Sequence, residues 1–142
     1  MRKHIIDCDA PPFAPERLSL AEEVHQVPGR VTGKFTWNPA TVALHLDQDQ
    51  QGGLIIGTDL AKRLADKKVL PAQVLDHLLA HPKLIPKEWR GKSVCFWGTV
   101  YRDPAGCLWI RFLSWDGRRW CWFVARLTHR CFSNGPAAVS AS

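Results

Sequence analysis

Two histidines and an aspartate lie close together in the segment DHLLAH, and these residue types can bind a metal ion or move protons. His81 follows His77 by four residues, about one helical turn, and Asp76 directly precedes His77. Histidines at this spacing can bind a metal ion or serve as acid and base. The segment offers no third ligand, so solvated helix histidines explain the spacing without a metal. The sequence therefore predicts neither a metal site nor a catalytic residue here, and an enzyme is the least supported class of function.

Two other segments share part of a chemical motif but lack the residues that complete it. Gly52, Gly53 and Gly57 precede an expected helix, as in phosphate-binding loops, but the lysine of a P-loop is missing. His129 lies two residues before Cys131, but no orienting partner for a cysteine nucleophile can be identified. The chain has no C-x-x-C pair, so we interpret its cysteines as reduced, buried residues rather than a disulfide framework. They are Cys8, Cys95, Cys107, Cys121 and Cys131.

The chain of 142 residues is long enough to form one domain with its own hydrophobic core. Its content of 46% hydrophobic and 23% charged residues is typical of a soluble globular protein. No apolar run reaches the roughly 20 residues that span a bilayer, and the N-terminus lacks the apolar region of a signal peptide. We therefore expect a cytoplasmic protein without a membrane segment. An N-terminal arm and short helix would occupy 1–27, and a single α+β domain would occupy 28–142.

Positive charge and tryptophan are concentrated in the last third of the chain. Residues 93–142 contain six arginines, no lysine and two aspartates, so they carry +4 of the net charge of +6. Five of the seven tryptophans lie between residues 93 and 127. Arginine stacks on aromatic rings and binds phosphate or carboxylate with its planar fork, which lysine does poorly. This composition permits a polyanionic partner without requiring one.

The pattern of turns and apolar residues predicts an α+β fold. Pro15 and a following capping-box pattern predict a short N-terminal helix that ends near Gln26. The runs 31–37 and 42–46 alternate between apolar and polar residues on either side of a turn sequence, so they predict a β-hairpin. Two short helices follow, and the second begins at Pro71 and carries an apolar stripe. The stripe consists of Val74, Leu75, Leu78 and Leu79.

Two turn sequences divide the Trp-rich region into a C-terminal three-stranded antiparallel meander. The sequence DPAG at 103–106 is typical of a type I turn with a following bulge, and Asp116-Gly117 is a strong two-residue hairpin signal. The expected strands cover about 93–102, 107–115 and 118–127. One face of this meander carries no charge, and we expect the helix stripe to cover it. This aliphatic face contains Val94, Phe96, Gly98, Val100, Leu108, Ile110, Phe112, Cys121, Phe123, Ala125 and Leu127.

The opposite face of the expected meander combines tryptophan with arginine. The expected register places Trp97 opposite Leu113 and Arg111 opposite Trp122, so both residue types share one surface. We call this surface the Trp/Arg face. Its candidate binding residues are Trp97, Tyr101, Trp109, Arg111, Trp115, Arg118, Trp120, Trp122 and Arg126.

Two interpretations of the Trp/Arg face remain open. Tryptophan is mostly buried in proteins, so the face can be internal packing or a surface between protomers. It can also be an open stacking platform on which aromatic rings hold flat groups and arginines meet phosphates. Arginines without an acid on their own face favour a partly wet surface, unless carboxylates from elsewhere pair with them. The acids that could do so are Asp47, Asp49 and Glu88.

These features favour a non-enzymatic, small, basic binding or interaction module that uses the Trp/Arg face and needs no cofactor. The expected ligand is single-stranded nucleic acid or another flat anionic partner. The alternative is a homo-oligomeric structural protein whose Trp-rich face is buried between protomers.

Three short motifs extend through the second half of the chain. The patterns LLAxPxLIPxxW, FWGTxYRD and RWxW occur at 78–89, 96–103 and 119–122. With these motifs the chain resembles a family of small hypothetical bacterial proteins. The resemblance runs from about Val31 to the C-terminus and leaves out the N-terminal arm. It implies a complete small protein, and it transfers no activity and no catalytic residue, because none is assigned to that family.

Overall fold

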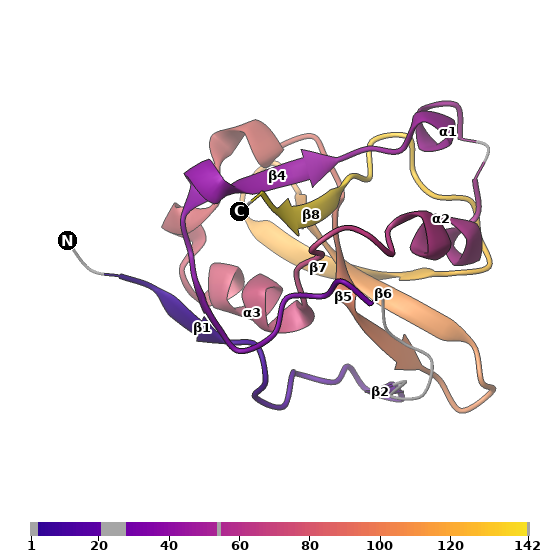
Figure 1. Ribbon diagram of the computed structural model, residues 1–142, viewed down its shortest axis with the longest axis horizontal. Helices are drawn as coiled ribbons and strands as arrows, with labels where there is room; N and C mark the ends of the chain where they lie inside the picture. Colours follow the sequence, from indigo (N-terminus) through magenta and orange to yellow (C-terminus); the bar gives the residue numbers. More distant parts are fainter. Residues whose placement is uncertain (1–2, 21–27, 54, 142) are drawn as a thin grey trace.

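Six strands form one sheet and two more form a small second sheet in the computed structural model, which describes residues 3–20, 28–53 and 55–141. The large sheet has the order β4–β8–β5–β6–β7, and β2 pairs with β5 outside this path (Figure 1). Its strands are β2 (Ser19–Leu20), β4 (Val42–His45), β5 (Val94–Arg102), β6 (Leu108–Trp115), β7 (Trp120–Arg126) and β8 (Ala137–Ser140). The small sheet pairs β1 (Ile5–Asp7) with β3 (Lys34–Thr36). The pairing of β5 with β8 is parallel, and the other pairings are antiparallel.

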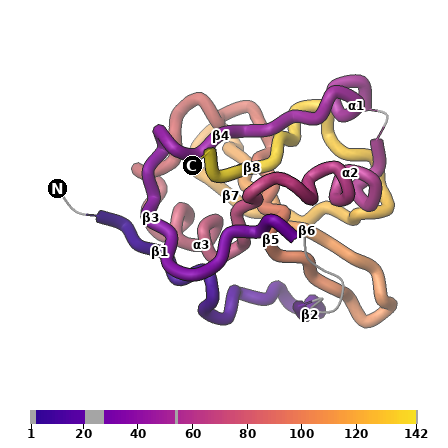
Figure 2. Tube along the Cα trace, in the orientation of Figure 1, coloured from indigo at the N-terminus to yellow at the C-terminus, as the bar shows by residue number. Residues whose placement is uncertain are grey.

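Short helices pack around the large sheet. The α-helices are α1 (Gln48–Gln51), α2 (Gly57–Arg63) and α3 (Ala72–Ala80). The 3₁₀ helices are η1 (Pro39–Thr41), η2 (Pro82–Leu84) and η3 (Lys87–Trp89). Figure 2 shows α3 beside β1, whereas α2 lies at the other end of the view. Within the described ranges, no helix is long and apolar enough to cross a membrane.

Side chains on the two faces of the sheet pack into two separate hydrophobic cores. Leu60 and Leu64 at α2 pack with Trp97 and its neighbours in the first core. The apolar stripe of α3 packs with Phe96 and Leu113 in the second core. Successive strand residues point to opposite faces, so Phe96 and Trp97 belong to different cores. The sheet is therefore covered on both faces.

The described part of the predicted N-terminal helix is not helical. Ser19 and Leu20 form β2 and pair with Arg102 and Tyr101 of β5. The Leu18 amide donates to the Pro15 carbonyl in a single turn before β2. The rest of the predicted helix, at 21–27, lies outside the described residues. The arm is thus tied to the sheet edge at the point where a helix was expected to begin.

The predicted hairpin between 31–37 and 42–46 is wrong. β3 pairs with β1 and β4 pairs with β8, so the two strands have partners from opposite ends of the chain. The side chain of Asn38 accepts a hydrogen bond from the Ala40 amide at 3.0 Å and caps η1. This helical turn separates the two strands instead of folding one back on the other.

The C-terminal segment of small residues forms a central strand, which the sequence did not indicate. β8 lies between β4 and β5, and Ala137, Ala138 and Val139 are buried. The Leu70 amide donates to the Ala138 carbonyl at 3.0 Å, and the Ser140 amide donates to Lys68 at 2.8 Å. Small side chains on β8 leave room for this crossing segment to approach the sheet backbone.

The predicted meander is present as β5, β6 and β7, but its second turn is longer than expected. Phe112 pairs with Phe123 and Trp115 with Trp120, a shift of two residues from the predicted register. The carboxylate of Asp116 accepts hydrogen bonds from the amides of Arg118 and Arg119 at 2.8 and 2.9 Å. These bonds close a four-residue turn. An even shift leaves every side chain of β7 on its predicted face.

β5 contains a bulge, and the side chains before the bulge point to the opposite face of the sheet from the one predicted. Tyr101 pairs with Trp109 as predicted, but Phe96 pairs with Arg111, and the register shifts between Phe96 and Tyr101. The shift is odd, so it exchanges the two faces of the strand. Trp97 therefore leaves the Trp/Arg face for the first core, and Phe96 takes its place.

Gly98 lies at this bulge because another segment of backbone crosses β5 there. Its amide donates to the Leu70 carbonyl at 3.0 Å, and its carbonyl accepts from the side chain of Arg30 at 2.7 Å. A Cβ atom at Gly98 would lie 2.7 Å from the nitrogen of Pro71. Only glycine admits this approach of the two backbones.

α3 covers the Trp/Arg face of the sheet and not the aliphatic face. The sequence predicted that the stripe of α3 would cover the aliphatic face. Instead Val74 and Leu78 pack with Leu113 of the Trp/Arg face, and α2 packs with Ile110 of the aliphatic face. The Trp/Arg face is therefore partly enclosed by its own chain.

We expect Gly98→Ala to lower the free energy of unfolding by about 1–3 kcal/mol, because the added methyl overlaps backbone that cannot move independently. Gly135→Ala is the matched control, since a Cβ there first meets the Phe132 side chain at 3.1 Å. Urea denaturation of both variants measures the difference. Equal stability of the two variants would contradict the close crossing at Gly98.

Candidate functional site: a buried arginine and an apolar cavity

The structure distributes the nine predicted binding residues over very different environments. Trp97, Tyr101 and Arg111 are buried, with exposed fractions of 2%, 0% and 1%. Arg118 is exposed at the tip of the β6–β7 hairpin. The half-buried ones are Trp109, Trp115, Trp120, Trp122 and Arg126. These residues therefore do not form one continuous open platform.

Arg111 lies at the centre of the Trp/Arg face and is enclosed by its own chain. Its Nη1 atom lies 2.9 Å from Oδ1 of Asp76 on α3. Its guanidinium carbon lies 4.5 Å from the ring centre of Trp122 and 5.0 Å from that of Phe13. Aromatic faces attract a desolvated cation. The arginine is thus held by one carboxylate and two rings.

Asp76 supplies the acid that the Trp/Arg face lacks. Of the three acids named from the sequence, Asp47 and Asp49 instead bind Arg63, at 2.9 and 2.6 Å. Burial raises the pKa of Asp76 above its ordinary value, and the charge of Arg111 opposes that rise. A hydrogen bond from Arg111 to this carboxylate opposes the rise as well, so the contact combines charge attraction with hydrogen bonding.

The tip of the β6–β7 hairpin keeps part of the predicted surface open. Trp115 and Trp120 pair across the strands with ring centres 5.4 Å apart. The guanidinium of Arg90 lies 4.0 Å from the ring centre of Trp115, and Arg118 is exposed nearby in the turn. This tip could stack one flat group, but it is a much smaller surface than the predicted face.

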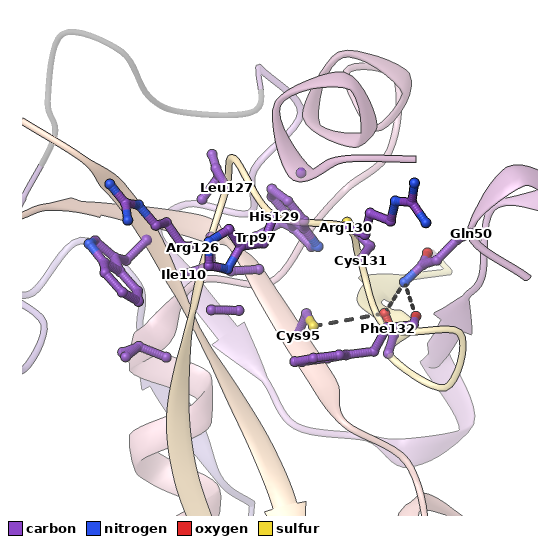
Figure 3. Close-up of a pocket in the computed structure, with 15 residues that line it drawn as sticks. Gln50, Cys95, Trp97, Ile110, Arg126, Leu127, His129, Arg130, Cys131 and Phe132 are labelled. Carbon is purple, nitrogen blue, oxygen red and sulfur yellow. Dashed lines mark hydrogen bonds between the residues drawn. The ribbon is translucent and has the colours of Figure 1, made fainter. Parts of the chain in front are cut away.

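A cavity of about 160 Å³ lies between β7, the loop that follows it and the start of α2 (Figure 3). Trp97, Ile110 and Leu127 contribute apolar side chains to its lining. The Gln50 side chain beside it donates to the carbonyls of Phe132 and Gly135, as the dashed lines show. These bonds fix the loop that closes one side of the cavity.

Two residues that line the cavity each have a buried polar atom without a hydrogen-bond partner within the described part of the chain. These atoms are the indole Nε1 of Trp97 and the Nε of Arg126. A buried donor without a partner costs about 1–3 kcal/mol, so such groups commonly mark a missing water or ligand. His129 and Arg130 also line the cavity and are exposed. The lining therefore combines apolar residues with donors and positive charge.

The two cysteines that line the cavity are not activated thiols. Burial raises the pKa of Cys95 far above its ordinary value and that of Cys131 to about 11. A nucleophilic cysteine requires a lowered pKa, since the thiolate is the reactive form. His129 was noted near Cys131 in the sequence, but these thiols remain protonated at neutral pH.

Two amides at the start of α2, where the glycine-rich segment ends, are not free to bind a phosphate. The Gly57 amide donates to His129 at 3.1 Å, and the Thr58 amide donates to Leu127 at 3.0 Å. Both groups are thus occupied by the chain that follows β7. This pairing instead places α2 against the cavity.

The two helix histidines have a third histidine beside them. His4 lies just before β1, and its Nδ1 atom is 3.1 Å from Nε2 of His77. One ligand atom from each of His4, His77 and His81 lies within 4.8 Å of the others. The sequence offered no third ligand because His4 is 73 residues away from His77. Burial and the neighbouring His81 and His4 lower the pKa of His77.

One of these placements has a signal in the sequence. Gly98 inside an expected strand is typical of a bulge, and a bulge moves Trp97 to the cavity side. The contact of Asp76 with Arg111 has no such signal, because it depends on how α3 packs.

No protein-family model, curated protein or solved structure matches this chain. The similarity to hypothetical bacterial proteins therefore remains a prediction from the motifs alone. The site must be interpreted from its own geometry.

We expect Asp76→Ala to lower the free energy of unfolding by about 3 kcal/mol, because it leaves a buried guanidinium without its counter-charge. Asp66→Ala, at an exposed aspartate, is the control and should change stability by less than about 0.5 kcal/mol. Chemical denaturation measures both. The double variant Asp76→Leu with Arg111→Met should recover much of the loss, and equal losses in the two aspartate variants would contradict the role of the pair.

Proposed function

We propose that this protein is a non-enzymatic binding module that holds a small, flat, anionic ligand in the cavity beside Trp97. The observation that carries the proposal is an apolar cavity lined by Trp97 and flanked by positively charged side chains. This keeps the binding function and the flat anionic ligand expected from the sequence, and it moves the binding surface. Trp97, Trp109 and Arg126 are the predicted residues that line the cavity.

The size and lining of the cavity select a ligand of one aromatic ring. An apolar cavity of about 150 Å³ in another protein stays dry and binds benzene. The present cavity is of similar size, at about 160 Å³. Its apolar lining favours a hydrocarbon ring.

The charge around the cavity favours an acidic substituent. Arg126, His129 and Arg130 line it, and no aspartate or glutamate among the described residues does. The carboxylate of Asp103 accepts a hydrogen bond from the indole of Trp109 at 2.9 Å, and this bond, together with the charge of Arg126, lowers the pKa of Asp103. Asp103 therefore offsets part of one positive charge and leaves Arg130 available to a ligand carboxylate.

An extended single strand of nucleic acid has less support as the ligand. A stacking platform needs accessible rings along the backbone path, and Trp97 and Tyr101 are buried. Arg111 is held by Asp76, so it is not available to a phosphate. The open hairpin tip at Trp115 could hold a single base, which makes an oligonucleotide a useful second probe.

Self-association is the second candidate function, and one observation favours it. β7 is at the edge of the sheet, and its Phe123 is 49% exposed. Phe132 is 43% exposed, and both rings lie against Phe112. An exposed edge strand with apolar side chains can pair with a second copy. The surface between protomers would then be this edge rather than the enclosed Trp/Arg face.

Benzoate is the probe for the cavity, and we expect it to quench tryptophan fluorescence with a saturable curve. Ala125→Phe should fill the cavity and weaken benzoate binding at least about tenfold, because Ala125 lines it. Ala105→Phe in the exposed 103–106 turn is the control. Benzyl alcohol tests the need for the anion, and oligothymidylate tests the nucleic-acid ligand. Benzoate binding that is absent, or unchanged in Ala125→Phe, would refute the proposal.

Light scattering over a range of concentrations tests the second candidate. If β7 pairs between protomers, the wild type is a dimer and Phe123→Lys is a monomer with an unchanged circular dichroism spectrum. Ile5→Lys is the matched control, since Ile5 is 57% exposed on β1, which belongs to the small sheet and not to the sheet that contains β7. A monomeric wild type at all concentrations would exclude this function.

A further inference from the structure

Three histidines from two distant parts of the chain meet beside α3. His77 and His81 occupy one side of this helix, with ring centres 4.6 Å apart. His4 lies over both, at 5.1 Å from His77 and 4.9 Å from His81 between ring centres. His4 and His77 are half-buried and His81 is exposed, so the group reaches the surface.

The spacing of their nitrogen atoms is close to that of a metal site. Zinc–nitrogen distances of about 2.0–2.1 Å place two ligand nitrogens of a tetrahedral site about 3.3 Å apart. Nδ1 of His4 and Nε2 of His77 share a hydrogen bond at 3.1 Å, whose proton a metal ion would displace, and His81 completes a group within 4.8 Å. Small side-chain rotations would bring the third nitrogen to the same distance.

The backbone around the histidines is held in place by the fold. The carbonyl of His4 accepts a hydrogen bond from the Trp37 amide at 2.8 Å, which continues the pairing of β1 with β3. The Ile6 side chain next in β1 is buried in the same core as Leu78 of α3. Both ligand-bearing segments are therefore fixed before any ion binds, as a preorganised site requires.

The charge state of the group also suits a metal ion. Three adjacent imidazoles cannot all be protonated without strong repulsion. A neutral imidazole presents the lone pair that binds metal. A shallow hollow lined by Asp7, Asp76 and His77 adjoins the group and gives solvent access.

We propose that His4, His77 and His81 bind one divalent transition-metal ion of the zinc class, with the remaining coordination positions open to water or an exogenous ligand. Imidazole ligands suit Zn²⁺, Ni²⁺ and Cu²⁺, whereas Ca²⁺ and Mg²⁺ prefer oxygen. Three protein ligands with an open position are the arrangement of catalytic rather than structural zinc sites. The ion would also join the N-terminal arm to α3, a link independent of the ligand cavity.

The test measures Zn²⁺ binding to the full, untagged, metal-free chain by calorimetry, with Co²⁺ absorption as a second readout. We expect one equivalent to bind and the melting temperature to rise by roughly 5–10 °C at 100 times Kd. The Co²⁺ spectrum should lack thiolate charge-transfer bands, which excludes binding at the cysteines. His4→Gln, His77→Gln and His81→Gln should each weaken binding at least about 100-fold, because even the loss of an outer-sphere partner costs about 10–100-fold.

The matched controls are His45→Gln and His129→Gln, which should bind like the wild type because neither residue belongs to the group. Circular dichroism of every variant shows whether it is folded. Three results would overturn the proposal: no stoichiometric binding, thiolate bands in the Co²⁺ spectrum, or full binding in His4→Gln. The last result would mean that the pair on α3 binds metal without the arm. His4→Gln should still bind benzoate, because His4 does not line the cavity, so the metal site and the cavity are tested independently.

Discussion

One buried positive charge constrains the arrangement of the whole Trp/Arg face. Arg111 is 1% exposed in the middle of β6, and removing a guanidinium from water is costly unless a carboxylate and aromatic rings surround it. Asp76 on α3, Phe13 in the arm and Trp122 on β7 provide that environment. Each comes from a different element, so the burial of Arg111 requires α3 and the arm to lie on this face of the sheet. The apolar stripe of α3 then packs beside the ion pair.

The sequence was most informative where structure depends on neighbours along the chain. The meander, the α3 stripe and the positions of both turns follow from local turn chemistry and period. The side-chain faces of β6 and β7 were also predicted, because the two-residue change of register in the Asp116 turn preserves alternation. The order of the other strands was not predictable in this way. The patterns of β3 and β4 would suit pairing with each other. Instead β3 pairs with β1 near the N-terminus, and β4 pairs with β8 near the C-terminus.

The candidate sites depend on contacts that are still more distant in sequence. Trp97 lines the cavity because the crossing at Leu70 and Gly98 turns over half of β5, and a two-residue period alone cannot reveal an odd shift. The pairing of Asp76 with Arg111 depends on which face of the sheet α3 covers. His4 meets the helix histidines only because β1 pairs with β3 and packs against α3. In each case the residue types were visible in the sequence, whereas their meeting is a property of the tertiary structure.

The N-terminal arm connects the two charged features of α3. It contributes His4 at the histidine group and Phe13 above Arg111, and the Tyr101 hydroxyl donates to the Phe13 carbonyl at 2.8 Å. Between them, the Gln73 side chain donates to the carbonyls of Cys8 and Ala10. These polar contacts add to the pairing of β1 with β3 and to the burial of Ile6 in fixing the arm against α3. A metal ion at the proposed site would hold the arm on α3 and so favour the enclosed state of Arg111. The reverse also follows from linkage: any change that releases Phe13 from Arg111 would weaken metal binding at His4.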